Sequence, residues 1–547
     1  MEAKELPARP NLEQYKKQAK EMVKACQAGD VASIERIEKQ RTTSHGGEIS
    51  LADAQFTIAR EHGFESWPKF ARHIEALSRE RKVASLADPR SAFLRAASVP
   101  RDAGHASGTL EDAEAILATY PEVATSDIYT AATLGDAGSV KGFLAADARN
   151  ATAKGGPYGW DALTHLCFSR YLRLDRRRSD GFVKAAKALL DAGADANTGW
   201  MEDEHEPRGT WESAIYGAAG LARHPELTHL LLEHGADPND EETAYHASET
   251  HDNRALKVLV ESGKLNETGL TTVLLRKTDW HDYEGVKWML EHGVDPNHLT
   301  RWGKTAIHNA VLSDNAIEIF EVLLDHGADP TMMAERSERL PKIAPQRSGV
   351  AMAARRGRRD VLELFERRGI RAELDGVDGL IAACAQNDAG RVQSIVEKEP
   401  RLVSELLAEG GRLLVQFAGV GNAEGVEQLL RLGVGVDQLS EEGDGYFDIA
   451  RNSTALHAAA WRARHQTVKL LLERGATVDA KDGKGRTPLA LAVRACVDSY
   501  WKERRSPESV RMLLSAGATA SGVEYPSGYA EVDELLREHG AKKSTDG

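Results

Sequence analysis

The sequence predicts an all-α solenoid of about a dozen helix pairs, joined by short hairpin loops and preceded by an N-terminal helical cap. The first observation is repetition: a unit ends in Glu291-His-Gly-Val-Asp-Pro-Asn297 and again in Asp325-His-Gly-Ala-Asp-Pro330. The second is the apolar spacing between these endings, which is typical of helices. The third is length, because 547 residues are too many for one ordinary globular core. Stacked repeats have no such limit.

Each unit is predicted to contain two short helices. Residues 306–311 place their apolar side chains on one face of the first helix. Residues 317–324 form a second helix that is apolar on more than one side, so it needs neighbours before and after it. Gly327 is expected to end this helix in the left-handed conformation, and Asp329-Pro330 then leads into a turn. Since one pair cannot bury these faces alone, the copies are expected to stack.

The period and the motif resemble those of the ankyrin-repeat family. Gly293 and Gly327 are 34 residues apart, and Gly303-Lys-Thr-Ala-Ile-His-Asn-Ala310 lies between them. The family's threonine and histidine positions are matched by three pairs: Thr243 with His246, Thr305 with His308, and Thr454 with His457. The resemblance implies that these side chains form hydrogen bonds between adjacent turns, so the three histidines are predicted to be structural.

The chain divides into four predicted parts. Residues 1–80 form an N-terminal helical cap module, in which residues 51–77 resemble a module at the head of bacterial ankyrin-repeat proteins. Asn11, Ser50 and Ser66 are the expected helix starts within it. Residues 81–90 are predicted as a polar linker, 91–540 as the solenoid and 541–547 as a flexible tail. Insertions into the solenoid are expected near 171–180, 198–211, 331–348, 438–452 and 496–506.

Charge and cysteine usage restrict the function classes. The formal net charge of −14 argues against nucleic acid and membrane partners. No run of 18 apolar residues occurs, and the first residues lack an apolar signal region. The four cysteines are far apart and follow no metal or disulfide spacing. We therefore expect a cytoplasmic protein that needs no metal or organic cofactor. The oligomeric state is not predicted.

The predicted function is binding of a protein or peptide along the concave groove, as an intracellular scaffold. In ankyrin-repeat proteins the hairpin tips and the ends of the first helices line this groove, and aromatic and arginine side chains dominate interface energies. An acidic partner with an apolar anchor would suit the local basic residues. The predicted partner-binding residues are Arg276, Trp280, His281, Arg301, Trp302, Lys304, Trp461 and Arg462.

The alternative is a small-molecule or enzymatic site in the middle repeats, about residues 212–302. Its candidate catalytic residues fall on consecutive units: Glu212, His251, Asp252, Asp279 and His281. The sequence alone cannot bring them within the distance that proton transfer requires. The insertions spread from about 171 to 506, which is too wide for one small pocket, so the binding scaffold is favoured.

A basic run at residues 170–178 has two interpretations. Its five arginines could hold an acidic peptide or a phosphate. Asp175 and Asp180 interrupt the positive charge, so a solvated loop is favoured. For Trp200, Trp211 and Trp501, exposure to a partner and packing of their own insertion remain equal alternatives.

Overall fold

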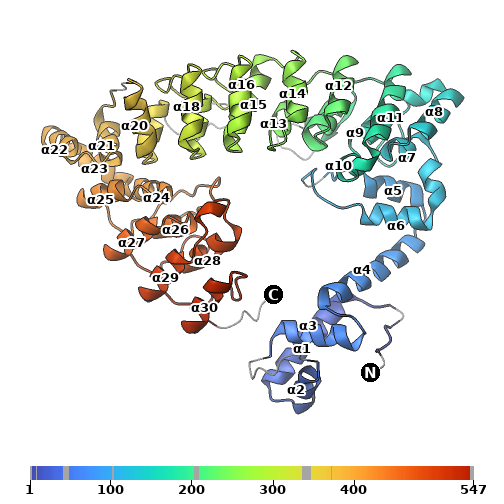
Figure 1. Ribbon diagram of the computed structural model, residues 1–547, viewed down its shortest axis with the longest axis horizontal. Coiled ribbons are helices and arrows are strands. Elements are labelled where there is room, and N and C mark those ends of the chain that lie inside the picture. Colours follow the sequence, from blue (N-terminus) through green and yellow to red (C-terminus); the bar gives the residue numbers. More distant parts are fainter. Residues whose placement is uncertain are drawn as a thin grey trace. The chain divides into compact units, whose positions relative to one another are not determined.

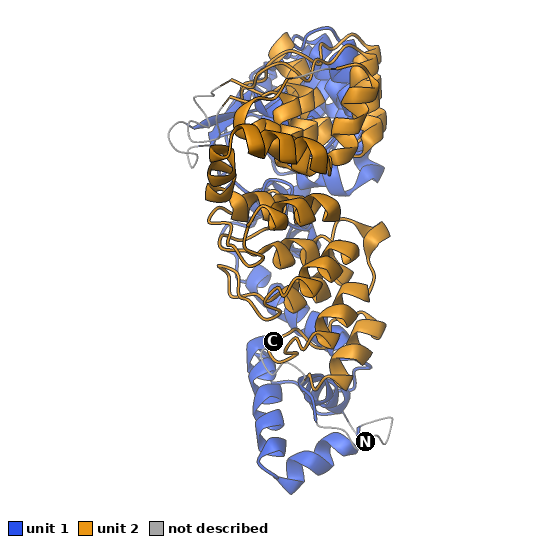
Figure 2. Cartoon of the chain, turned by 90° about the vertical axis from the view of Figure 1, so that its left-hand side faces the viewer, with its two compact units in different colours: residues 1–266 blue, residues 267–547 orange. Residues whose placement is uncertain are grey.

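The structure is a computed structural model that describes residues 3–7, 9–40, 49–101, 104–202, 209–335, 346–370 and 373–541 (Figure 1). The chain forms two compact units, residues 1–266 and residues 267–547, which Figure 2 colours separately. Parts of the predicted cap module at 1–80, of the insertions at 198–211 and 331–348, and of the tail at 541–547 lie outside the described residues.

The first unit begins with four helices around a core of their own. These are α1 (Leu12–Gln27), α2 (Val31–Glu38), α3 (Leu51–Glu61) and α4 (Trp67–Ala84). The predicted helix starts are present: Asn11 accepts a hydrogen bond from the Glu13 amide, and Ser50 forms a capping box with Asp53. Phe70 is fully buried at the centre of this core. The predicted linker is partly wrong, because residues 81–84 continue α4 and Val83 is buried.

Helix pairs then follow in the first unit. They are α5 (Pro89–Ala97) with α6 (Glu111–Thr119), α7 (Ile128–Thr133) with α8 (Ala137–Ala146), α9 (Ala162–Cys167) with α11 (Ser179–Asp191), the π-helix η4 (Tyr216–Leu221) with α12 (Pro225–Glu233), and α13 (Glu242–Ala247) with α14 (Arg254–Glu261). The shorter elements are η1 (Pro121–Thr125), η2 (Ala148–Ala151), α10 (Arg170–Leu174) and η3 (Arg176–Arg178).

The second unit continues the same pattern. Its helices are α15 (Glu267–Asp279), α16 (Tyr283–Glu291), α17 (Ala306–Leu312), α18 (Ile317–Asp325), α19 (Gly349–Arg355), α20 (Arg359–Arg367), α21 (Gly376–Ala385), α22 (Ala389–Lys398), α23 (Arg401–Ala408), α24 (Gly410–Val420), α25 (Ala423–Arg431), α26 (Ala455–Trp461), α27 (His465–Glu473), α28 (Pro488–Asp498), η5 (Lys502–Arg504), α29 (Glu508–Ser515) and α30 (Ala530–Glu538). First helices pack on first helices, as α15 does on α17, and second helices on second helices, as α16 does on α18.

This stacking confirms the predicted all-α solenoid. In the described ranges the named strands are β1 (Gly199–Glu202) and β2 (Thr210–Ser213), an antiparallel pair with Trp200 opposite Glu212. The pair belongs to the insertion predicted at 198–211. Gly327 has a φ of 83°, which confirms the predicted left-handed end of α18.

Two of the three repeat histidines have the predicted structural role. Nδ1 of His308 lies 2.7 Å from Thr305 Oγ1, and its Nε2 donates to the carbonyl oxygen of Arg347 (3.1 Å). His457 joins Thr454 to the carbonyl oxygens of Ala480 and Arg486 in the same way. Burial lowers the pKa of both imidazoles, so they are neutral side chains of the repeat stack. His246 differs, and its contacts are described with the site below.

Candidate functional site

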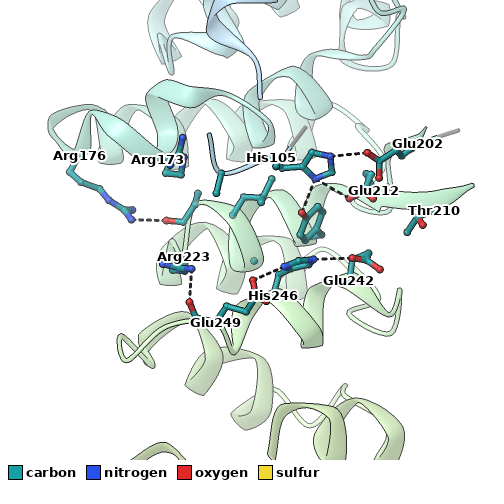
Figure 3. A pocket seen from close by; sticks show the side chains of 16 residues that line it. His105, Arg173, Arg176, Glu202, Thr210, Glu212, Arg223, Glu242, His246 and Glu249 are labelled. Carbon is teal, nitrogen blue, oxygen red and sulfur yellow. Dashed lines mark hydrogen bonds and ion pairs between the residues drawn. The ribbon is translucent and has the colours of Figure 1, made fainter. Parts of the chain in front are cut away.

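A pocket of about 670 Å³ lies in the first unit (Figure 3). Its walls come from residues 104–106, the η3 region, the β1–β2 hairpin, η4 and α13. The polar side chains that line it are His105, Arg173, Arg176, Glu202, Thr210, Glu212, Tyr216, Arg223, Glu242, His246 and Glu249. Figure 3 shows the three arginines on one side and His105, Glu202 and Glu212 on the other.

One side of the pocket is organised around His105. Its Nδ1 lies 2.9 Å from the Tyr216 hydroxyl, and its Nε2 lies 3.2 Å from Oε1 of Glu202. Oε2 of Glu212 is 3.9 Å from the Nδ1 atom and has no hydrogen-bond partner, although this carboxyl group is buried. Burial, together with the neighbouring Glu242 and Glu202, raises the pKa of Glu212 to about 8. Glu212 is therefore a neutral acid near pH 7.

His246 lies between two carboxylates at the next helix. Its Nδ1 contacts Glu249 (2.8 Å) and its Nε2 contacts Glu242 (3.1 Å). Burial alone would lower the pKa of His246, but the hydrogen bonds to these carboxylates outweigh it and raise the pKa to about 9. The predicted role of His246 in joining adjacent repeats is therefore wrong, because its two ring nitrogens contact Glu249 and Glu242 of its own repeat. Glutamates four residues before and three residues after a histidine lie on the same helix face, so this spacing in the sequence could have predicted the contacts of His246.

The other side of the pocket holds three arginines, one each from α10, η3 and the turn after η4. Nη2 of Arg176 donates to the Ala222 carbonyl oxygen (2.6 Å), and Nη2 of Arg223 donates to the Glu249 carbonyl oxygen (2.7 Å). Nη2 of Arg173 donates to the Ser107 carbonyl oxygen (3.3 Å). Burial lowers the pKa of Arg173 and of Arg176. The favoured interpretation of the 170–178 run as a solvated loop is therefore wrong for the half-buried Arg173, whereas Arg176 is an exposed residue whose guanidinium donates to the Ala222 carbonyl oxygen.

The local backbone explains how these groups come together. The π-helix η4 replaces the first helix of its repeat, and such turns are frequent at functional sites. Gly220 in η4 allows the close approach, because a Cβ there would lie 2.7 Å from Cδ2 of Tyr216 and 3.2 Å from the Cβ of His246. Trp200 is buried beside His105, and the ring of Trp160 stacks on it with a centroid separation of 5.5 Å. Trp211 is 41% exposed, so the insertion at 198–211 has one buried and one exposed tryptophan.

Raising the pH from 6.5 to 9 is expected to destabilise the first unit by about 2 kcal/mol. The pKa of His246 rises from 6.5 to about 9 on folding, so its contribution is complete below pH 6.5 and is lost as the pH approaches 9. The pKa of Glu212 rises from 4.5 to about 8, so the folded state also binds this proton more tightly and loses stability through pH 8. Thermal unfolding of the chain across this range measures the change.

The variant His246→Gln should have a shallower dependence on pH over the same interval. His229→Gln is the matched control, because the His229 side chain is 64% exposed and also lies beside a glutamate, Glu233. Stability that rises between pH 6.5 and 9, or an equal slope in the two variants, would contradict this account.

The predicted partner-binding residues lie in the second unit, and six of them belong to two segments: the end of α15 with the turn after it, and the hairpin between α16 and α17. We call Arg276, Trp280, His281, Arg301, Trp302 and Lys304 the Trp280–Trp302 strip. Arg276 pairs with Asp279 at the end of α15, and Trp280, which follows directly, is 38% exposed. His281 has a φ of 51° in the turn before α16, and burial lowers its pKa.

The hairpin between α16 and α17 carries the rest of the strip. Thr300 donates its amide to the Lys304 carbonyl oxygen (2.9 Å), which places Arg301 and Trp302 at the tip. The guanidinium of Arg301 lies over the Trp302 ring, 4.5 Å from its centroid. Both side chains are half-buried, and burial lowers the pKa of Lys304.

Trp461 and Arg462 do not belong to this strip, and their predicted role as accessible partner contacts is wrong. Trp461 is 2% exposed, and its Nε1 donates to the Phe447 carbonyl oxygen (2.6 Å). Arg462 is also 2% exposed; its guanidinium carbon lies 3.9 Å from the Phe447 ring centroid. The physical reason is that the insertion at 438–452 folds over them, and its Tyr446 hydroxyl donates to the Asp279 carbonyl oxygen (2.8 Å).

The candidate catalytic residues do not form one described cluster. Glu212 lines the pocket of the first unit, where His251 and Asp252 are not among the lining residues. Asp252 instead pairs with Arg254 (2.7 Å). Asp279 and His281 belong to the second unit, where Oδ1 of Asp279 accepts hydrogen bonds from Asn309 (2.7 Å) and Ser313 (3.0 Å).

Two negative findings apply to the described residues alone. No group of three or more His, Cys, Asp and Glu side chains there is arranged to hold a metal ion. Among the same residues, no helix has both the length and the apolar character that crossing a membrane requires.

Two ankyrin-repeat family models match the chain, one described as three copies at residues 413–521 and one as many copies at residues 289–337. Cyclin-dependent kinase 4 inhibitor B of Mus musculus is 32% identical over 112 residues, which are 20% of this chain and 75% of that protein. The Homo sapiens protein of that name is 32% identical over 113 residues, which are 21% of this chain and 72% of that protein.

Two further matches are partial. Serine/threonine-protein kinase 12 of Arabidopsis thaliana is 39% identical over 85 residues, and the match spans 16% of this chain and only 17% of the kinase. The crystal structure of the human ASB11 ankyrin repeat domain aligns with 21% identity and a TM-score of 0.22, covering 50% of this chain and 96% of that domain. Ankyrin repeats are generally protein-interaction modules, and a protein-binding role without a specified partner fits the sequence matches.

Proposed function

The chain belongs to the ankyrin-repeat family, and we propose that it is a scaffold that binds a protein or peptide through the Trp280–Trp302 strip of its second unit. The observation that carries this proposal is the pairing of Arg301 with Trp302 on a hairpin tip. A second tryptophan of the same unit, Trp280, follows the end of α15 and is 38% exposed. Tryptophan and arginine are the residue types most enriched among side chains that dominate interface energies.

The rigidity of the strip supports the proposal. The carbonyl oxygen of Gly303 accepts a hydrogen bond from the amide of Glu335 (2.8 Å), so the hairpin is held by the following repeat. A Cβ at Gly303 would lie 2.1 Å from the Glu335 carbonyl oxygen, so this close approach requires glycine. A surface held in this way loses little conformational entropy on binding.

The charge of the strip favours an acidic partner. Arg276, Arg301 and Lys304 contribute cationic side chains to the strip; Arg301 lies over the Trp302 ring, and Arg276 pairs with Asp279. A partner with acidic side chains around an apolar anchor would complement this arrangement. We place this binding inside the cell, because Cys167, Cys384 and Cys496 are buried free thiols, which a reducing compartment preserves.

The variant Trp302→Ala is expected to weaken partner binding by about 2 kcal/mol or more, which is roughly 30-fold in Kd. Proteins recovered on the wild-type chain from a native extract would be identified by mass spectrometry. Each candidate would then be purified and titrated against both chains by calorimetry, so that recovery alone does not decide the result.

Tyr500→Ala is the matched control, because Tyr500 is an aromatic residue of the same unit that is 83% exposed and lies outside the strip. It should leave the Kd unchanged. If every purified partner binds the Trp302 and Tyr500 variants equally well, the strip is not the binding surface. Circular dichroism of each variant checks that helicity is retained.

A further inference from the structure

Three arginines gather on one side of the first unit's pocket, where the carboxylates of Asp252 and Glu226 act on Arg176 without forming an ion pair with it. Arg173, Arg176 and Arg223 each donate a hydrogen bond to a backbone carbonyl oxygen, and in the described part of the chain none of the three forms an ion pair. The Nε atoms of Arg173 and Arg223 are buried and have no hydrogen-bond partner. Arg223 is close enough to Arg173 to lower its pKa. Guanidinium groups held together in this way favour an anion between them.

Arg177, which belongs to the same run, provides a comparison with an arginine on the surface. Arg177 is 90% exposed, and its guanidinium forms an ion pair with Asp175 (2.7 Å). Arg173 and Arg176, on either side of that aspartate in the sequence, turn into the pocket instead. Burying a polar atom of a charged group without a partner costs free energy, as at the Nε atoms of Arg173 and Arg223, and a bound anion would offset that cost. Arg176 is an exposed residue that borders the same pocket.

The opposite side of the pocket offers the complementary chemistry. Oε2 of Glu212 is unpartnered although the residue is 1% exposed, and the carboxylates of Glu202 and Glu242 line the same side. Buried polar atoms are rarely left without a hydrogen bond, so we expect a ligand to form a hydrogen bond with this oxygen. The surrounding negative charge favours ammonium or hydroxyl donors.

We propose that this pocket binds a small polar molecule that carries an anionic group, a carboxylate or a phosphate, at one end and ammonium or hydroxyl donors at the other. The anionic group contacts Arg173, Arg176 and Arg223, and the donors contact the side formed by Glu202, Glu212 and Glu242. A volume of about 670 Å³ lies within the range of pockets that hold metabolites. The site lies in the first unit, so it is independent of the protein-binding strip in the second.

Calorimetric titration of the full chain with four probes tests the proposal. Glucosamine 6-phosphate carries a phosphate with both kinds of donor, and glucuronate carries a carboxylate with hydroxyl groups. Inorganic phosphate and glucosamine each supply one end alone. We expect at least one two-ended probe to bind tenfold or more tightly than either single-ended probe. The preference between the two-ended probes identifies the anionic group.

Two kinds of variant show which side of the pocket binds each end of the ligand. Arg176→Gln and Arg223→Gln should each weaken the two-ended probe and inorganic phosphate by tenfold or more. Glu202→Gln should weaken the two-ended probe and glucosamine but leave inorganic phosphate unchanged. Arg177→Gln is the matched control and should bind every probe as the wild-type chain does. Circular dichroism and thermal unfolding identify any variant that does not fold. If one of the two arginine variants fails to fold, the other is used for the comparison.

The proposal is overturned if neither two-ended probe binds more tightly than inorganic phosphate. It is equally overturned if a folded Arg176 or Arg223 variant binds as tightly as the Arg177 variant. Because none of these substitutions touches the Trp280–Trp302 strip, partner binding measured on the same variants should not change.

Discussion

The variant Asp314→Asn is expected to destabilise the second unit by about 3–5 kcal/mol, because it removes the carboxylate that pairs with the buried Arg462 and leaves Arg356 with only the more distant Asp444 (3.4 Å). The Asp314 carboxylate lies 3.0 Å from Nε of Arg356 and 2.5 Å from Nη1 of Arg462, and its side chain is 4% exposed. Arg358 is 4.0 Å away. Asparagine is a suitable replacement, since Asp314 has a φ of 50° and asparagine tolerates this conformation.

The electrostatics of this cluster set the sign of its dependence on pH. Burial alone would raise the pKa of Asp314, but the Arg356 and Arg462 guanidiniums outweigh it and hold the pKa well below the usual range. The contribution of Asp314 is therefore complete above the ordinary pKa of about 4 and is lost only as the pH falls well below that value.

Urea unfolding followed by tryptophan fluorescence measures the effect, because Trp461 and Trp501 lie near this cluster. Asp325→Asn is the matched control. Asp325 also pairs with an arginine, Arg368 (2.6 Å), but its side chain is 54% exposed, and such pairs contribute about 0–1 kcal/mol. Equal losses of stability in the two variants would show that the buried cluster adds nothing beyond a surface ion pair.

The variant Leu323→Ala is expected to cost roughly 2–5 kcal/mol in the repeats around α18, because it opens a cavity between stacked helices. Leu323 is fully buried, and α18 packs against α16 and α20. Since each repeat contacts mainly its neighbours, the loss should be local. Hydrogen exchange of the α16, α18 and α20 amides measures it directly.

Leu324→Ala is the control on the next position of the same helix, where the leucine is half-buried. It removes the same atoms from a less enclosed site, so its cost should be smaller. If Leu323→Ala leaves hydrogen exchange in α18 unchanged, or if Leu324→Ala has the larger effect, then Leu323 is not the side chain enclosed between the stacked helices.

Local sequence signals predicted most of the fold, because they act within one helix or turn. Gly327 ends α18 with a positive φ, and Ser50 and Asp53 form their capping box, since both features depend only on neighbouring backbone atoms. The repeat motif likewise predicted the contacts of His308 and His457, which reach only into the next repeat.

The sites depend on longer contacts, and there the predictions were less successful. Trp461 and Arg462 were expected to face a partner, yet Phe447 of the 438–452 insertion covers them. Nothing in the spacing of that insertion shows where it folds. Similarly, Arg176 belongs to a run that resembles a solvated loop, and only its hydrogen bond to the Ala222 carbonyl oxygen places it in the pocket.

The sequence by itself determined the repeat, the helix pairs and the structural role of two histidines, because periodicity and capping are local properties of the chain. The tertiary structure decided which polar groups meet. His105 and Tyr216 are 111 positions apart, and Asp314 and Arg462 are 148 apart, yet both pairs are in hydrogen-bond contact. The physical reason is that insertions follow no period, so their side chains find partners only when the stacked helices hold the loops in place.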